Sequence, residues 1–178
     1  DAVPYGLGHD MVMRNRLSGP MLASLGGVAA RPDAADRLLG AGRNVLVYPG
    51  GDVDSNRPYD ARDRIVFGGR RGYVRAALRA GAPIVPLVAA GAHEAFVVLA
   101  DLSGVAEMTG AARWLRMKVW PLTLSIPWGL WLGPTPPYVP WPSRIIVEVL
   151  EPIRFERTGV EAAADGAWVE ACAQRVEE

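Results

Sequence analysis

The chain has 178 residues, half of them hydrophobic, and its 19 basic residues balance 19 acidic ones. This length suits one domain with a substantial core, and the composition excludes a disordered tail. Zero net charge excludes a broadly basic surface, so we expect no nucleic-acid partner. A single cysteine, Cys172, rules out an internal disulfide and agrees with a reducing compartment. We predict that Cys172 is a packed side chain in a helix and not a nucleophile.

The start of the chain shows no signal peptide, because no basic start is followed by an apolar core. The first residue is Asp1 and not a methionine, which suggests that an upstream portion is missing. We therefore expect one domain over residues 1–178 that is incomplete at its N-terminus.

Helices and short apolar strands alternate along the chain. In chain order, the predicted helices cover 11–25 (interrupted or ended near Ser18-Gly19-Pro20), 32–40, 72–80, 95–117 (broken near Ser103-Gly104) and 160–176. The predicted strands cover 26–30, 45–48, 83–88 and 144–150. This order predicts an α/β fold, a three-layer domain with a mixed, largely parallel sheet flanked by helices.

The block 45–94 predicts a βαβ unit with a ligand site. An apolar run stops at Pro49-Gly50-Gly51, an arginine-rich loop and a helix follow, and a second apolar run begins at Pro83. Open sheets of this kind bind ligands at the carboxyl ends of their strands. We therefore expect Gly50 and Gly51 to lie beside a ligand.

The arginines of this block indicate that the ligand is anionic. Seven arginines fall between positions 57 and 79: Arg57, Arg62, Arg64, Arg70, Arg71, Arg75 and Arg79. Arg70 and Arg71 precede the predicted helix, where free N–H groups and the helix dipole also favour an anion. The alternative is a solvated face paired with Asp52, Asp54, Asp60 and Asp63, which suits Arg75 and Arg79 best.

Residues 119–143 carry no charged side chain but contain seven prolines and four tryptophans. The prolines would break a membrane-spanning helix, so this Pro/Trp-rich segment is not a transmembrane span. The tryptophans of the segment and Tyr138 favour the membrane–water interface, and the basic residues just upstream would face anionic headgroups. The tryptophans are Trp120, Trp128, Trp131 and Trp141, with Trp114 just before them, and the basic residues are Arg113, Arg116 and Lys118. We expect a membrane-facing segment; the alternative is a proline-rich wrap with its aromatic rings packed inward.

Other sites find little support. There is no P-loop, no GxGxxG after a strand, no GxSxG, and no cysteine–histidine spacing typical of a metal site, so we expect no metal and no cofactor. The two histidines, His9 and His93, each precede an acid, but consecutive side chains point in different directions. A satisfied structural role is the default for both.

Three groups of residues together resemble the glycerolipid (lysophospholipid) acyltransferase family, in its diacylglycerol-acyltransferase-like branch. They are Tyr48-Pro49-Gly50-Gly51, residues 67–75 (FGGRRGYVR) and residues 81–86 (GAPIVP). Residues 126–129 (IPWG) and 151–153 (EPI) are similar to that branch too. The resemblance covers residues 10–154.

The resemblance implies transfer of an acyl group from acyl-CoA or acyl carrier protein to a lipid hydroxyl. The family's catalytic motif is a histidine and an aspartate separated by four residues. His9 does not complete it, because the matching position is Arg14. On this resemblance Asp1 is the motif's aspartate, its histidine lies five positions upstream, and the chain as given is inert. Gly50, Gly51, Arg70 and Arg71 would hold an anionic group of the substrate.

We therefore expect an acyltransferase in lipid metabolism, with phospholipid biosynthesis as its setting. Its partners would be an acyl thioester and a lipid acceptor, and it would be cytoplasmic, peripheral on the inner face of a membrane. One alternative is a catalytically silent lipid- or acyl-CoA-binding module on the same fold. Another is a soluble hydrolase with His93 as its base, for which the sequence shows no nucleophile.

Overall fold

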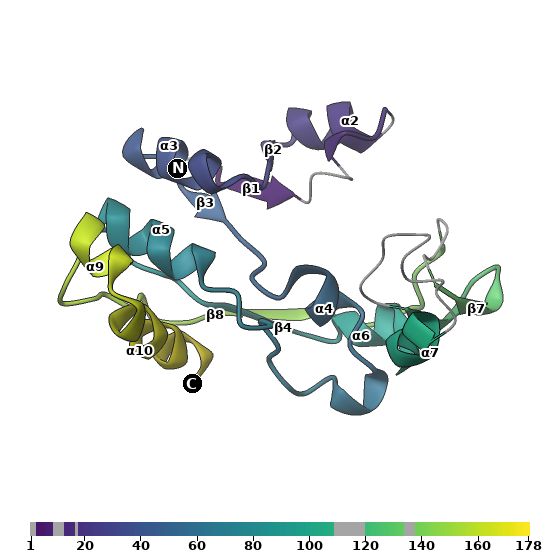
Figure 1. Ribbon diagram of the computed structural model, residues 1–178. Coiled ribbons are helices and arrows are strands. Elements are labelled where there is room, and N and C mark those ends of the chain that lie inside the picture. The colour runs from purple at the N-terminus through teal and green to yellow at the C-terminus, as the bar shows by residue number, and fades with distance from the viewer. Residues whose placement is uncertain (1–2, 9–12, 17, 109–119, 134–137) are drawn as a thin grey trace. The chain divides into compact units, whose positions relative to one another are not determined.

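The computed structural model describes residues 3–8, 13–16, 18–108, 120–133 and 138–178 (Figure 1). The chain divides into two compact units, each made of separate stretches. The first unit contains residues 1–49, 69–86 and 151–178, and the second contains 50–68 and 87–150.

The first unit contains a parallel sheet of three short strands in the order β2-β1-β3. They are β1 (Tyr5–Gly8), β2 (Gly27–Ala29) and β3 (Val45–Leu46), and they are joined through the helices α2 (Ser18–Ser24) and α3 (Pro32–Gly40). Pro32 opens α3, where its missing N–H would have no helical partner in any case. The predicted strand at 26–30 and helix at 32–40 are confirmed.

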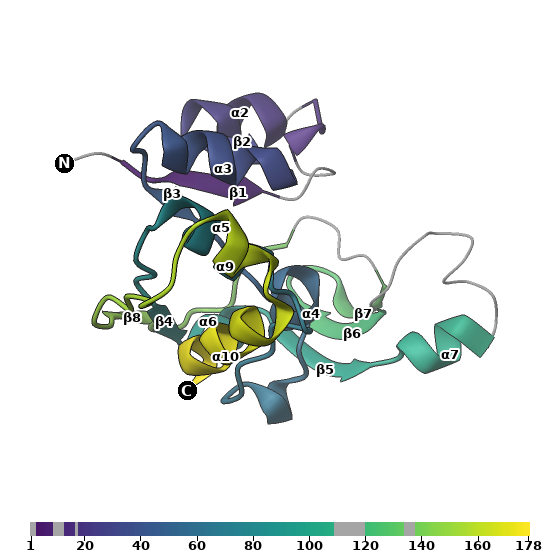
Figure 2. The same cartoon turned by 60° about the vertical axis from the view of Figure 1, so that its left-hand side comes forward.

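A cluster of three helices supplies the core of the first unit. They are α5 (Gly72–Ala80), α9 (Val160–Ala164) and α10 (Gly166–Glu177), which lie side by side in Figures 1 and 2. The buried core residues are Val74, Leu78, Ala163, Val169, Cys172 and Ala173. Cys172 is only 3% exposed, so its prediction as a packed side chain is confirmed. The α5 helix ends at Gly81, whose φ of 61° suits a residue without a Cβ.

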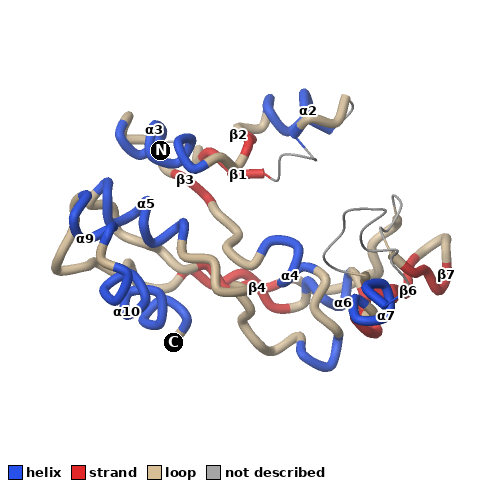
Figure 3. Tube along the Cα trace, viewed as in Figure 1, coloured by secondary structure: helices blue, strands red, loops and turns tan. Residues whose placement is uncertain are grey.

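The second unit contains two antiparallel sheets. One pairs β4 (Leu87–Ala90) with β8 (Ile146–Val149), and the other has the order β5-β6-β7, from β5 (Val97–Asp101), β6 (Pro121–Ser125) and β7 (Gly129–Leu132). The helices here are short: α4 (Gly51–Ser55), the 3-10 helix η1 (Tyr59–Ala61), α6 (Ala92–Ala95) and α7 (Ser103–Met108). The strands are red in Figure 3, and β6 and β7 form a hairpin with a short turn between them. Within the described residues, no helix has the length and apolar character to cross a membrane.

The α/β class is confirmed, but the expected single, largely parallel sheet is wrong. Only the β2-β1-β3 sheet is parallel, and the predicted βαβ unit does not form among the described residues. The run after α5 makes one isolated bridge, Ile84 to Ile153, before β4 pairs with β8. Pro83 and Pro86 flank that bridge, and neither offers the N–H that a central strand needs.

Three predicted helices also need correction. Residues 97–101 form β5 and not a helix, because the valine-rich run pairs along β6. The C-terminal helix is broken at Asp165, whose side chain accepts a hydrogen bond from the Trp168 N–H and so begins α10. In the predicted helix over 11–25, residues 14–16 form a turn and Ser18-Gly19-Pro20 begins α2, so the expected interruption falls just before these residues; a proline in the first turn of a helix is tolerated.

Candidate functional site

The turn after β3 requires both of its glycines. Gly50 is buried, and a Cβ built on it would lie 2.2 Å from the Asp54 Cβ and 2.5 Å from the Val66 carbonyl oxygen. Gly51 begins α4 with a φ of 50°, which side chains disfavour. The missing Cβ of Gly50 therefore makes room for other protein atoms, so packing alone explains this glycine.

Arg70 and Arg71 immediately precede α5, as the sequence predicts. Arg71 is at the N-cap position, where its side chain makes no capping hydrogen bond. Arg70 is exposed, and its Nη1 donates to the Pro49 carbonyl oxygen at 3.3 Å. Both arginines belong to the first unit, whereas Gly50 and Gly51 belong to the second. The free N–H groups at the start of this nine-residue helix add positive potential to the two guanidinium groups.

The Arg71 guanidinium is held by two carboxylates of α10. Its Nε and Nη2 donate to the two oxygens of Glu170, both at 2.9 Å, and its Nη1 donates to Glu177 at 2.6 Å. The hydrogen bonds with Glu170 hold the pKa of Arg71 above its ordinary value and that of Glu170 below its own. Arg71 thus joins the start of α5 to α10, a contact that neither sequence interpretation of this residue foresaw.

Tyr73 lies beside this ion pair at the start of α5. Burial, and next the negative charge of Glu177, raise the pKa of its hydroxyl to about 12. The phenol is therefore neutral at physiological pH and packs against the core of the first unit.

Arg75 and Arg79 tie α5 to its neighbours. Arg75 Nη1 donates to the Ala163 carbonyl oxygen at 2.6 Å, and Arg79 Nη2 lies 2.9 Å from Asp36 Oδ1 on α3. The alternative interpretation, in which both arginines pair with acids of 52–63, does not match these partners. Their partners are 88 and 43 residues away in the chain, so sequence spacing carries no signal of them.

The second unit contains a polar cluster centred on Arg57, which is only 9% exposed. Its guanidinium pairs with Asp54, donates to the Arg62 carbonyl oxygen at 2.8 Å, and lies 2.8 Å from the Nε2 of His93. A guanidinium has no acceptor, so Nε2 accepts and the proton of the neutral ring is on Nδ1. Burial, and then the charge of Arg57, lower the pKa of His93.

This geometry gives His93 the structural role that was its default. Its Nε2 is engaged by Arg57, which weakens the hydrolase interpretation because that nitrogen cannot also take a proton from a nucleophile. The neighbouring Glu94 pairs with Arg62 at 3.7 Å, and Arg62 also lies over the Tyr59 ring. The sequence reasoning missed the contact between Arg57 and His93.

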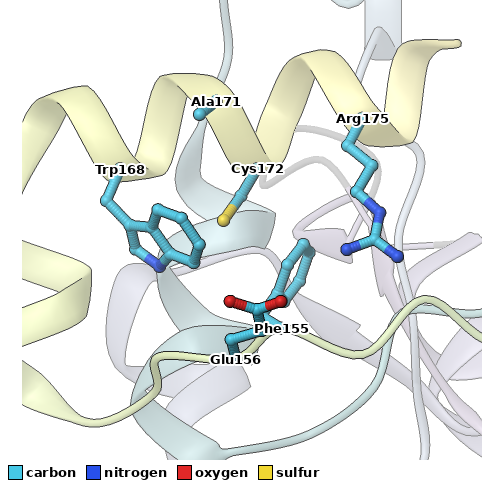
Figure 4. A pocket seen from close by; sticks show the side chains of 6 residues that line it. All are labelled: Phe155, Glu156, Trp168, Ala171, Cys172 and Arg175. Atoms are coloured by element: carbon cyan, nitrogen blue, oxygen red, sulfur yellow. The ribbon is translucent and has the colours of Figure 1, made fainter.

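A shallow hollow of about 310 Å³ opens on the first unit (Figure 4). Its lining residues are Phe155, Glu156, Trp168, Ala171, Cys172 and Arg175. In Figure 4 the Cys172 thiol points between the Trp168 and Phe155 rings. Burial raises the pKa of this thiol, which keeps it protonated and unreactive. None of the predicted site residues lines the hollow.

Two predicted residues lie outside the part of the chain that the structure describes. They are Asp1, the expected aspartate of the catalytic pair, and His9. The same holds for Arg113, Arg116 and Lys118, the basic residues expected to face headgroups.

Comparison with known proteins points to one family. A family model described as diacylglycerol acyltransferase matches residues 12–165. An uncharacterized protein of Mycobacterium tuberculosis is 33% identical over 147 residues, which cover 83% of this chain and 38% of that protein. Human diacylglycerol O-acyltransferase 2 is 28% identical over 133 residues, covering 70% of this chain and 33% of that protein.

An uncharacterized protein of Mycobacterium leprae is 32% identical over 144 residues, covering 81% of this chain and 36% of that protein. The chain thus spans well under half the length of the curated relatives it matches. No solved structure matches it. None of these matches supports the expected setting in phospholipid biosynthesis.

Proposed function

The chain belongs to the diacylglycerol acyltransferase family, and from this we propose that it carries the substrate-holding part of an O-acyltransferase. The enzyme would move a fatty acyl group from a thioester donor, acyl-CoA or acyl carrier protein, to a hydroxyl of a glycerolipid such as diacylglycerol. The main support for this proposal is the family match over residues 12–165, which includes both the Pro-Gly-Gly turn and α5. Because the two units are interleaved, we treat residues 1–178 as one acyltransferase-like domain.

The proton transfer is assigned to Asp1 and a histidine five positions upstream of it. The histidine would take the proton of the acceptor hydroxyl while that oxygen attacks the thioester carbonyl carbon. The carbon–sulfur bond then breaks, and the thiolate leaves with the proton from the imidazolium. Asp1 would fix the imidazole tautomer and stabilise its positive charge.

The start of α5 is proposed to hold an anionic group of the substrate. Arg70 is exposed there, and the helix dipole favours a negative charge at the same place. Arg71 is already bound bidentately by Glu170, so it orients the end of the helix. We assign direct contact with the anion chiefly to Arg70, because this residue is exposed at the start of the helix.

The site of action is proposed to be a membrane surface, with the enzyme peripheral on the inner face. The support is the charge-free segment 119–143, of which Trp128, Trp131 and Tyr138 are each 39–47% exposed. Trp120 is instead buried and Trp141 donates to the Leu124 carbonyl oxygen. Inward packing therefore accounts for only some of the aromatic rings.

The test is acyl transfer by the protein extended upstream of Asp1. Transfer of labelled acyl groups from acyl-CoA to diacylglycerol in mixed micelles would be followed by thin-layer chromatography. Substitution of the upstream histidine by alanine should lower kcat on the order of a thousandfold, because the general base is lost. Asp1→Asn should lower kcat as well, with little change in KM.

Two outcomes would contradict the proposal. If no histidine lies five positions before Asp1, the assignment of the pair fails. If acyl-CoA binds to the extended protein but no transfer occurs with any glycerolipid hydroxyl, the chain is a silent binding module on the same fold.

A further inference from the structure

The sheet β5-β6-β7 presents its most apolar face to the outside. Leu122 pairs with Leu132 and Leu124 with Leu130 across β6 and β7, and directly paired residues share one face of a sheet. Three of these leucines are well exposed: Leu124 by 38%, Leu130 by 62% and Leu132 by 51%. The four residues Leu122, Leu124, Leu130 and Leu132 are called the leucine face below.

The opposite face of β6 carries two buried polar side chains, and the residues paired with Thr123 on that face are Val98 and Trp131. Thr123 and Ser125 alternate with the leucines on β6 and are 0% and 2% exposed. The Ser125 hydroxyl is buried without a hydrogen-bond partner among the described residues. A sheet with one face in water normally buries its apolar side chains and exposes its polar ones. Along β6 the arrangement is reversed, so water is a poor match for the leucine face.

The surroundings of the leucine face match hydrocarbon and its boundary. No charged residue occurs between Val119 and Ser143, so nothing there would have to leave water as an ion. Trp128 lies in the turn between β6 and β7, whereas Trp131 pairs with Thr123 on the face of the sheet opposite the leucines; their ring centroids are 6.2 Å apart, and both are exposed. Tryptophans at the edge of an uncharged apolar surface are typical of a membrane–water interface, whereas protein interfaces carry charged or hydrogen-bonding rims.

We propose that the leucine face is the surface by which the protein contacts the acyl chains of a bilayer. The proposal rests on the proposed function for the membrane location and deepens it, because it assigns the contact to these leucines and leaves Trp128, in the turn, at the headgroup level. The contact is shallow. The β7 strand is the edge of its sheet, and its backbone N–H and C=O groups need water or headgroups, so only side chains enter the hydrocarbon.

The first test measures binding of the full chain to vesicles of pure phosphatidylcholine by flotation. Leu130→Ser with Leu132→Ser should weaken binding on the order of tenfold or more, since two side chains no longer gain from leaving water. Ile146→Ser with Val149→Ser is the matched control. Those two β8 residues are exposed by 56% and 64%, and their variant should bind as the parent does.

The outcomes separate the possible occupants of the face. Equal loss in both double variants overturns the proposal, because general apolarity would then explain binding. Unchanged vesicle binding overturns it too, and if the Leu130/Leu132 variant also changes from dimer to monomer in sedimentation, the occupant is a second copy. Circular dichroism and a retained thermal transition establish that the variants fold.

A second measurement keeps three of the four leucines. Cys172 is the only cysteine and is buried, so Leu132→Cys offers a single accessible thiol for an environment-sensitive fluorophore. Its emission should rise on vesicle binding and be quenched by lipids brominated on the acyl chain, whereas a label at the exposed Thr158→Cys should not respond. Absence of quenching at position 132 overturns the proposal. Neither measurement requires catalysis, so a failure of the acyl-transfer assay leaves these results interpretable, and the reverse also holds.

Discussion

Beside the Cα of Gly50, the space that a side chain would occupy is filled by the Asp54 Cβ and the Val66 carbonyl oxygen. Gly50→Ala forces these atoms apart, so we predict a loss of roughly 2–4 kcal/mol in the free energy of unfolding. Gly72→Ala is the control, because a Cβ at this first residue of α5 would have no atom within 4 Å. That substitution should leave stability unchanged or raise it slightly. Urea denaturation measures both, and equal effects would contradict the packing argument.

The lowered pKa of His93 predicts a dependence of stability on pH. Its ordinary value is 6.5, and a folded-state value below that means that the unfolded chain binds more protons between the two. The contribution of His93 to stability is therefore complete above pH 6.5 and is lost as the pH falls toward the folded value. Arg57 opposes the imidazolium, while Asp54 and Glu94 favour it less strongly.

His93→Gln keeps an acceptor for Arg57 but does not titrate. The fall in the free energy of unfolding between pH 7 and 5 should be shallower in this variant than in the parent. The other histidine, His9, is present in both proteins and so does not affect the comparison. Chemical denaturation at several pH values gives the two slopes. Parallel slopes would show that His93 titrates alike in the folded and unfolded chains.

At the level of single residues, the sequence predicts where a residue lies in a helix or loop better than it predicts the distant residue that it contacts. Arg70 and Arg71 fall at the start of α5 as expected, because a helix boundary depends on nearby residues. The partner of Arg71 on α10 is 99 residues away, and the nitrogen that His93 accepts from belongs to a residue 36 positions earlier. Such contacts follow from tertiary packing, which leaves no local signal.

Between elements, the pair formed by Arg71 with Glu170 and Glu177 connects α5 to α10. Its side chain is 19% exposed, and its bond to Glu170 is bidentate, which favours a measurable contribution. Arg71→Ala should lower the melting temperature by roughly 2–4 °C. Arg37→Ala is the matched control, since Arg37 pairs with Asp33 one turn away on α3 and is 71% exposed, and it should change little.

The same region tests the division of roles at the helix start. Arg70→Ala should raise the KM of the extended enzyme, whereas the main effect of Arg71→Ala should be a lower melting temperature. If Arg71→Ala changes only KM, the carboxylates of α10 do not hold that residue in solution.

Helices whose ends are set by a nearby proline or glycine can be predicted from the sequence, whereas strands that depend on pairing with a distant segment cannot. Pro32 and Gly81 mark helix ends that the structure confirms. The prediction of a helix over β5 is wrong. The alanine-containing flanks of this run favour a helix, and only its pairing with β6 makes it a strand. Pro83 and Pro86 carry a signal against a central strand, which the predicted strand at 83–88 left out of account.

For the molecule as a whole, the two units should differ in how long their amides resist exchange. The core of α5, α9 and α10 is buried, whereas every residue of β4 and β8 is exposed and the two strands form a sheet alone. An isolated two-stranded sheet is marginally stable in water. Hydrogen exchange followed by mass spectrometry should show fast exchange in β4 and β8 and slow exchange in α5 and α10. If the amides of β4 and β8 were as protected as those of α5 and α10, another surface would have to cover the two-stranded sheet in solution.

The interleaving of the two units affects how the chain can fold during synthesis. Val74 and Leu78 leave the ribosome early, but the residues that pack against them, Ala163, Val169, Cys172 and Ala173, follow only after the whole stretch 87–150 of the second unit. The core of the first unit therefore cannot assemble vectorially and has to wait until residues 160–177 have emerged. Until then α5 lacks the residues of α9 and α10 that cover its apolar side chains, and a nascent chain in that state is a substrate for chaperones.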